Sequence, residues 1–399
     1  MFHPAAPVRN LFHSECNHWQ FVPLLMCIFY PKYEQRSDLW NSGMFEEFGF
    51  ETLTATQASL YFALGLGLLF GVFSEQVKFC FRRALIGADR AQAAGVWAMA
   101  LLVAVLGTQY FVTTEIIGFD DHRFKSDFPV VQIVLGGLVF GAGMVLTRGC
   151  VGRLTVLGAT GNLRAVTALL IFAVVAHATL KGVLSPLRTE TGDIGPKLDA
   201  ISLSESFGNI LPLAIIATIT GAIIWRSGSS ILSLLGGAAI GGLVIAGWLG
   251  TGFILYDDFD PIAFESIAFT SPWTDSIFWT LASTSVSAKF GVGLVGGVIA
   301  GAFLSAAASG RLTWQSFEGP AHFGRFAAGA SLMGFGGVLA GGCTIGAGLS
   351  GIPSLSIVPI TALLAIGLGA MITHRLVDST PSTYGSDGQG TIPHQQPAE

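Results

Sequence analysis

The stretch GAGMVLTRGCVGRLTVLG (Gly141–Gly158) has a partner later in the chain, GFGGVLAGGCTIGAGLSG (Gly334–Gly351). At a constant offset the two copies share several glycines and a Gly-Cys pair, which ends at Cys150 in one copy and Cys343 in the other. Both predict an apolar helix that breaks at Gly-Cys and restarts after a loop. Glycine-broken hydrophobic segments at matching places in two halves of a membrane chain indicate a binding site for a transported molecule.

The composition decides the class of protein. The chain is 51% hydrophobic and 11% charged, with a mean hydropathy of +0.64, whereas a soluble domain is about 25% charged. Its apolar runs are continuous rather than alternating, which predicts membrane-spanning helices and not a barrel. The 52 glycines are explained mostly by close helix packing, because small residues let helices approach each other in lipid.

We predict an all-α integral membrane protein with about nine transmembrane helices, each near the ~20 residues that a bilayer requires. The predicted spans are 57–77, 92–118, 130–149, 160–184, 210–226, 231–256, 290–308, 322–341 and 355–375. The apolar stretch 261–288 is interrupted by Glu265, Pro272 and Asp275, so it favours short re-entrant segments over a further span.

The chain divides into three parts. Residues 1–43 form an atypical N-terminal segment that differs from the rest and is a candidate for exclusion from the native chain. Residues 44–378 are predicted to be a single transmembrane domain, with halves of about 57–184 and 231–375. The polar tail 379–399 is predicted to be disordered.

The distribution of positive charge predicts the orientation in the membrane. Basic residues gather in the loop around Arg82, at Arg226, near Arg311 and at Arg375, while the loop Asp257–Asp260 is acidic. With the basic loops inside, the N-terminus lies outside and the C-terminus lies in the cytoplasm. The two Gly-Cys copies then fall on spans three and eight, which run in opposite directions, so the repeat is inverted.

Three of the five cysteines, Cys80, Cys150 and Cys343, lie where hydrophobic runs end, and there is no CxxC pair. This pattern argues against a disulfide framework or a zinc site, and we predict no metal and no cofactor. Taken singly, each cysteine also fits a small buried hydrophobic residue. At a helix break inside the membrane, however, unpaired N–H groups favour an anion, and a thiol is a weak donor that suits a site which must release its ligand.

The candidate substrate-binding residues surround these breaks. They are Cys80, Cys150, Cys343, Arg148, Gly149, Gly342 and Thr344. Arg148 and Arg153 flank Cys150 and would draw an anion toward it, but both also fit the alternative of arginines that reach from the helix end to the cytoplasmic surface.

The sequence resembles the YeeE/YedE family of bacterial inner-membrane sulfur-compound transporters, whose characterised members take up thiosulfate. The resemblance is carried by LMGFGGVLAGGCTIGAGLSG (Leu332–Gly351), by ESIAFTSP (Glu265–Pro272) and, less specifically, by VKFCFRRALIG (Val77–Gly87). It implies an hourglass-shaped path along which an anion passes between thiols through S–H hydrogen bonds. It also implies a multi-pass protein of the inner membrane, surrounded by lipid, that is not an enzyme.

The resemblance further implies a small cytosolic sulfur-carrier protein of the TusA kind as a partner that consumes the substrate. One departure concerns the substrate, because RGCVGRL (Arg148–Leu154) carries an arginine where many relatives have a small residue. That change would tighten binding of thiosulfate or shift selectivity toward another sulfur oxyanion.

Other functions fit the same residues less well. A membrane thiol oxidoreductase would need closely paired cysteines and usually a haem or quinone site, and the sequence has neither a CxxC nor a histidine pair. Transport of a selenium compound fits the cysteines, whereas a soft metal would need more thiolate, Met or His ligands than the chain offers.

Overall fold

The computed structural model describes residues 54–119, 122, 124, 128–194, 197–198, 210–257, 260–317 and 319–378. The predictions for residues 1–43 and for the tail 379–399 lie outside these described residues.

The described part is mainly helical, with one short antiparallel pairing of β1 (Phe128–Pro129) with β2 (Lys197–Leu198) and an isolated parallel bridge between Asn162 and Gln315. The helices of the first part of the chain are α3 (Ala55–Gln76), α4 (Phe81–Ile86), α5 (Arg90–Thr113), α6 (Val130–Leu146), α7 (Val151–Ala159), α8 (Leu163–Lys181), α9 (Ser185–Asp193) and α11 (Ile210–Ser227). The later helices are α12 (Ile231–Leu249), α13 (Thr270–Leu281), α14 (Phe290–Ala308), α15 (Pro320–Leu339) and α16 (Ile357–Asp378). Two π-helical turns, η1 (Gly250–Ile254) and η2 (Thr344–Leu349), and the 3-10 turn η3 (Ile352–Ser354) complete the described elements.

Nine helical segments of the described residues are long and apolar enough to cross a membrane, which confirms the prediction of nine spans. They are Ala55–Ile86, Arg90–Thr113, Val130–Ala159, Leu163–Lys181, Ile210–Ser227, Ile231–Ile254, Phe290–Ala308, Pro320–Leu349 and Ile357–Val377. Each overlaps one predicted span, because the length of an apolar run is a local property of the sequence.

The segment between the sixth and seventh spans does not cross, as predicted. Its helix α13 has only 12 residues, and the chain before it is non-helical and partly buried, with Ile267 and Phe269 fully enclosed. Side chains satisfy the backbone of this buried segment, since Ser350 Oγ donates to the carbonyl of Ile267 at 2.6 Å and Thr251 Oγ1 donates to that of Glu265 at 2.7 Å. Such backbone is tolerated at membrane depth only when it is enclosed by protein.

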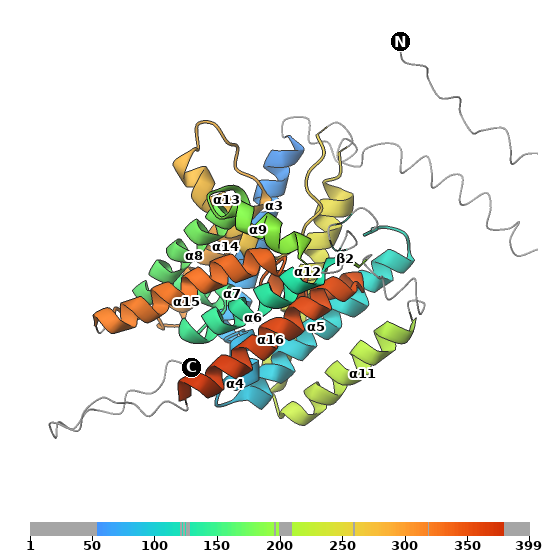
Figure 1. Cartoon of the computed structure of the whole chain (residues 1–399). Helices are drawn as coiled ribbons and strands as arrows, with labels where there is room; N and C mark the ends of the chain where they lie inside the picture. The colour runs from blue at the N-terminus through green and yellow to red at the C-terminus, as the bar shows by residue number, and fades with distance from the viewer. Residues whose placement is uncertain are drawn as a thin grey trace, which may run out of the picture. The chain divides into compact units, whose positions relative to one another are not determined.

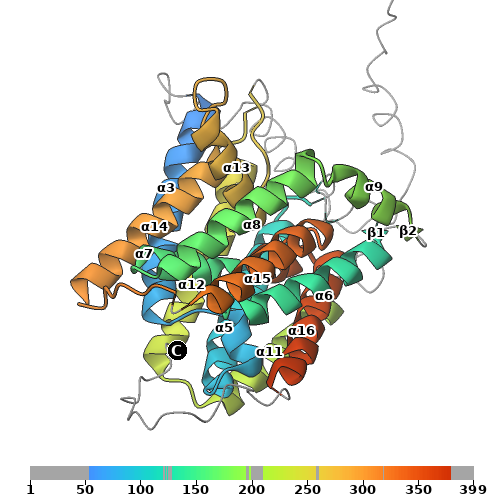
Figure 2. The ribbon, with the colours of Figure 1, turned by 60° about the vertical axis from the view of Figure 1, so that its left-hand side comes forward.

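Glycines set which helices lie together. A Cβ on Gly67 would lie 2.3 Å from the carbonyl oxygen of Leu294, and one on Gly71 would lie 2.4 Å from that of Val298, so α3 and α14 run parallel in close contact (Figures 1 and 2). The same kind of contact pairs α5 with α12 and α6 with α16, again in parallel. Small residues allow this approach of two backbones.

The two Gly-Cys helices are themselves partners. A Cβ on Gly136 of α6 would touch Ala340 at the end of α15, whereas one on Gly143 would touch Gly329 near its middle. Later residues of α6 thus contact earlier residues of α15, so these two helices are antiparallel. Helices α3 and α12 are also antiparallel, because Gly236 meets Val77 while Gly250, just beyond the end of α12, meets Phe62.

These pairings follow one pattern. Four helices of the first part, α3, α5, α6 and α8, can be matched in order with α12, α14, α15 and α16. In this matching α3 is equivalent to α12 and α5 to α14, so the contact of α3 with α14 is equivalent to the contact of α12 with α5. Likewise, the contact of α6 with α16 corresponds to that of α15 with α8. Within this matching, the pairs α3/α12 and α6/α15 run in opposite directions.

Candidate functional site

Three helix breaks share one backbone geometry. A residue in the left-handed region stands two positions before each cysteine, namely Lys78 (φ 52°), Arg148 (φ 58°) and Gly341 (φ 74°). Cys80 and Cys150 are then the extended N-cap residues of α4 and α7. Cys343 caps η2 in the same way. The left-handed residue ends one helix and redirects the chain so that the next begins.

The predicted loop after Gly-Cys is therefore wrong in detail. The short second helix starts at the residue that follows each cysteine, at Phe81, Val151 and Thr344. Each break contains four residues, of which the cysteine is the last. Cys80 belongs to the same class of break as the other two, although its sequence motif is the least similar.

The three thiols are buried and free, with exposed fractions of 7% for Cys80, 1% for Cys150 and 1% for Cys343. All three belong to one continuous core cluster. The side chains of Cys80 and Cys150 contact each other, although 70 residues separate them in the sequence.

Thr344 connects the second and third breaks. Its hydroxyl is buried and faces the thiol of Cys150, but it makes no hydrogen bond of ordinary length. The preceding residue is Cys343, whose Sγ accepts a hydrogen bond of 3.3 Å from the backbone N–H of Gly346. The chain thus places the groups in the order Cys343, Thr344, Cys150 and Cys80.

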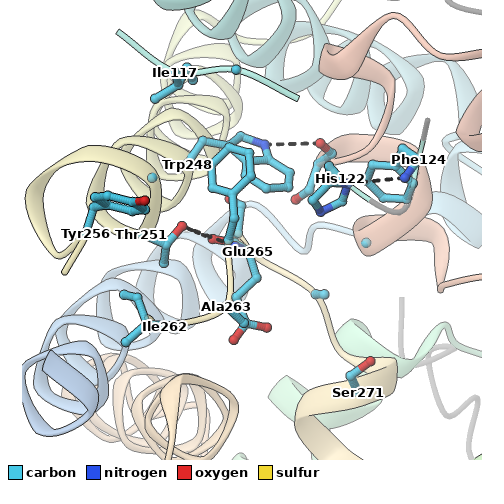
Figure 3. Close-up of a pocket in the computed structure, with 17 residues that line it drawn as sticks. Ile117, His122, Phe124, Trp248, Thr251, Tyr256, Ile262, Ala263, Glu265 and Ser271 are labelled. Carbon is cyan, nitrogen blue, oxygen red and sulfur yellow. Dashed lines mark hydrogen bonds between the residues drawn. The ribbon is translucent and has the colours of Figure 1, made fainter. Parts of the chain in front are cut away.

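A cavity of about 600 Å³ lies on the Cys343 side of this line. We call it the outer cavity; its walls come from the segment after α5, the end of α12 with η1, the non-helical segment before α13 and η2. Figure 3 shows Trp248, His122 and Phe124 together on one wall and Ser271, at the start of α13, on another. Its inner end reaches Gly346, the residue that bonds Cys343.

A second cavity of about 670 Å³, here called the basic cavity, lies at the other end of α5, where Ala88 precedes that helix. The described residues that line it include Lys78, Arg82, Arg148, Arg153, Arg164, Arg311 and Arg325, together with His374 and, among these described residues, one acid, Glu75. That acid is paired, because its Oε2 accepts hydrogen bonds from Ser305 Oγ at 2.8 Å and from Arg311 at 2.7 Å. Basic side chains outnumber acidic ones in the described lining of this cavity, and a cleft lined mostly by one sign of charge attracts ions of the opposite sign.

Aromatic and aliphatic side chains separate the two cavities. The ring of Phe70 lies 6.4 Å from that of Phe79, next to Cys80, and 5.5 Å from that of Phe269. A Cβ on Gly152 would lie 2.5 Å from Ile345 and 3.3 Å from Phe269. The thiols therefore sit in a closed, mostly apolar constriction between two cavities.

The predicted binding residues differ in burial and in their distance from the thiols. Arg148 is exposed, with its side chain at the wall of the basic cavity. Gly149 and Gly342 are buried backbone positions directly before the cysteines. Arg153, which was noted in the sequence but is absent from the predicted binding set, is half-buried and interacts electrostatically with both Cys80 and Cys150. The feature of the sequence that points to Arg153 is its position three residues after Cys150, in the first turn of α7.

Nine spans, two cavities at opposite ends of the bundle and a buried thiol line between them define a multi-pass membrane protein with the architecture of a transporter. The chain belongs to the sulphur transport family, the YeeE/YedE family, since the family model matches residues 77–233 and again 229–372. Two successive matches of one model indicate an internal duplication. A relative from Spirochaeta thermophila, named thiosulfate transporter TsuA, is 27% identical over 315 residues, which cover 75% of this chain and 93% of the relative.

Proposed function

We propose that this protein imports thiosulfate, or a closely similar small sulfur anion, through the bacterial inner membrane. The observation that carries the proposal is the line of buried groups Cys343, Thr344, Cys150 and Cys80, which lies between Gly346 in the wall of the outer cavity and Arg153 in the wall of the basic cavity. The family and the name of the relative support a sulfur oxyanion as the cargo.

In this proposal the anion passes between thiols by exchanging S–H hydrogen bonds. A neutral thiol donates a weak hydrogen bond, so each station holds the anion without trapping it. The half-buried Arg153 places a positive charge beside the last two thiols, and Arg148 lies further along the exit, in the wall of the basic cavity. Gly149, Gly342 and Thr344 contribute the backbone and hydroxyl groups of the constriction.

The antiparallel matching of α3 with α12 and of α6 with α15 supports an inverted repeat. The basic cavity supports the predicted orientation, with that end in the cytoplasm and the N-terminus outside, because basic residues concentrate on the cytoplasmic side of membrane proteins. The proposed transporter domain is 44–378, with halves of about 57–184 and 231–375.

Import of a dianion against a potential of 100 mV, negative inside, costs roughly 4.6 kcal/mol. Consumption of thiosulfate at the inner face would supply this energy. A small sulfur-carrier protein of the TusA kind is the proposed consumer, and the basic cavity is its proposed docking face. Uptake of thiosulfate into membrane vesicles should increase when the carrier protein is enclosed in them. Arg325→Glu, at the wall of the basic cavity, should reduce that increase.

Uptake of labelled thiosulfate tests the cargo and the thiol path together. Cells that express Cys343→Ala or Cys150→Ala should lose uptake, because each variant removes one donor from the line. Cys343→Ser should retain part of the uptake, since a hydroxyl is still a donor. Immunoblots of membranes establish equal amounts of protein, and normal uptake by both alanine variants would refute the thiol path.

The alternative cargo is another sulfur or selenium species, favoured by the arginine at position 148. Competition decides between the two cargoes. Unlabelled thiosulfate should suppress labelled uptake more strongly than sulfite, sulfate or selenite, and stronger suppression by any of these would identify the alternative. A thiol oxidoreductase would instead lose its function equally with alanine or serine at Cys343.

A further inference from the structure

Cys80 and Cys150 form a pair, whereas Cys343 stands apart. Their side chains are in contact, both residues are buried, and both are free thiols. Cys343 instead has a backbone partner, the N–H of Gly346. The chain therefore has two thiols that can react with each other and a third that can serve as an internal comparison.

The same backbone geometry brings the pair together. Each thiol belongs to the N-cap residue of a short helix, and each follows a left-handed residue by two positions. Helix α4 packs on α5, and α7 packs on α8, α14 and α3. The two N-caps are thus held by different parts of the bundle, and a bond between their sulfurs would tie those parts together.

A small oxidant can approach this pair from the basic cavity when the constriction opens. The basic cavity is lined by Lys78 and Arg82, which flank Cys80 in the sequence, and by Arg148 and Arg153, which flank Cys150 in the sequence. Hydrogen peroxide is smaller than the proposed cargo and carries no charge. Local opening of the side chains that enclose the thiols admits peroxide from this cavity, whether or not the path carries thiosulfate.

We propose that Cys80 and Cys150 form a reversible redox site, at which a hydroperoxide converts the thiol pair to a disulfide and closes the transport path. The effect on transport rests on the proposed function, but formation of the disulfide does not.

The chemistry balances in two steps. The thiolate of one cysteine attacks the peroxide, breaks its O–O bond and gives a sulfenic acid and hydroxide. The second thiol attacks the sulfenic sulfur, forms the S–S bond and releases water. Together the two thiols lose two electrons and two protons, and the peroxide is reduced to two water molecules.

The disulfide would block the path for two reasons. It removes both S–H donors, because a disulfide has no hydrogen to donate. It also fixes the N-caps of α4 and α7 together at the constriction. The reducing conditions of the cytoplasm keep cysteines in the thiol form. The disulfide therefore forms, and the path closes, only under oxidative stress, and the path reopens when cellular thiols reduce the disulfide.

Peptide mass spectrometry tests the site directly. Purified full-length protein is treated with hydrogen peroxide, its remaining thiols are alkylated, and it is digested without reductant. The expected product is a peptide pair linked through Cys80 and Cys150, which disappears after dithiothreitol. Cys343→Ser should form the same link, and Cys80→Ser should not.

Uptake measurements then test the consequence. Peroxide should abolish thiosulfate uptake by the unchanged protein, and dithiothreitol should restore it. Failure to detect the linked peptide, with both thiols still alkylated after treatment, would overturn the redox site whatever the transport result. A linked peptide in a protein that still transports at the full rate would overturn the closure.

Discussion

At the scale of single residues, the two arginines that flank Cys150 have different environments. Arg153 is half-buried and within electrostatic range of both thiols, whereas Arg148 is exposed and has a left-handed backbone. We expect Arg153→Gln to reduce thiosulfate uptake strongly and Arg148→Gln to reduce it only slightly. The initial rate of labelled uptake at several concentrations measures both, and a larger loss from the Arg148 variant would assign the anion contact to that side chain.

The left-handed residues before the cysteines also give a test of stability. A left-handed backbone costs a residue with a Cβ about 1 kcal/mol or more, and a Cβ on Gly341 would meet no atom within 4 Å. Gly341→Ala should therefore lower the free energy of unfolding by about 1 kcal/mol through the backbone alone. Arg148→Gly should raise it by a similar amount. Thermal unfolding in detergent measures both, and shifts in the same direction would contradict this account.

At the scale of helices, glycine contacts hold the two repeats together. A Cβ on Gly141 would lie 2.2 Å from the carbonyl oxygen of Ile366, so α6 and α16 would have to separate. Gly141→Ala should destabilise the protein by about 1–3 kcal/mol, the usual cost of overpacking. Gly65 of α3 is the matched control, because a Cβ there meets nothing within 4 Å. Gly65→Ala should leave the melting temperature unchanged or raise it, and equal losses from both variants would show that helix separation is not the cause.

At the scale of the whole molecule, the two cavities open at opposite ends of the bundle, and the proposed orientation places the basic one in the cytoplasm. Tyr256 is exposed in the outer cavity, and Ala88 is exposed in the basic cavity. A membrane-impermeant thiol reagent should label Tyr256→Cys in intact cells, above the background of the unchanged protein. It should label Ala88→Cys only after the cells are permeabilised. The reverse pattern would invert the proposed topology.

The sequence by itself determined the nine spans, the non-spanning segment before α14 and the existence of two similar Gly-Cys breaks. Span lengths and breaks are local properties: an apolar run of about 20 residues must form a helix in lipid to satisfy its own backbone. The family likeness of the Cys343 segment could also be read without a structure.

Only the tertiary structure decided which of these features meet. It brought Cys80 against Cys150 and Thr344 toward Cys150, and it placed Arg153 rather than Arg148 beside the thiols. It also replaced the predicted loops with helices that restart at the cysteines. The reason is physical, because interhelical contacts in lipid depend on close packing at many glycines, and one left-handed residue decides which way the chain turns at each break.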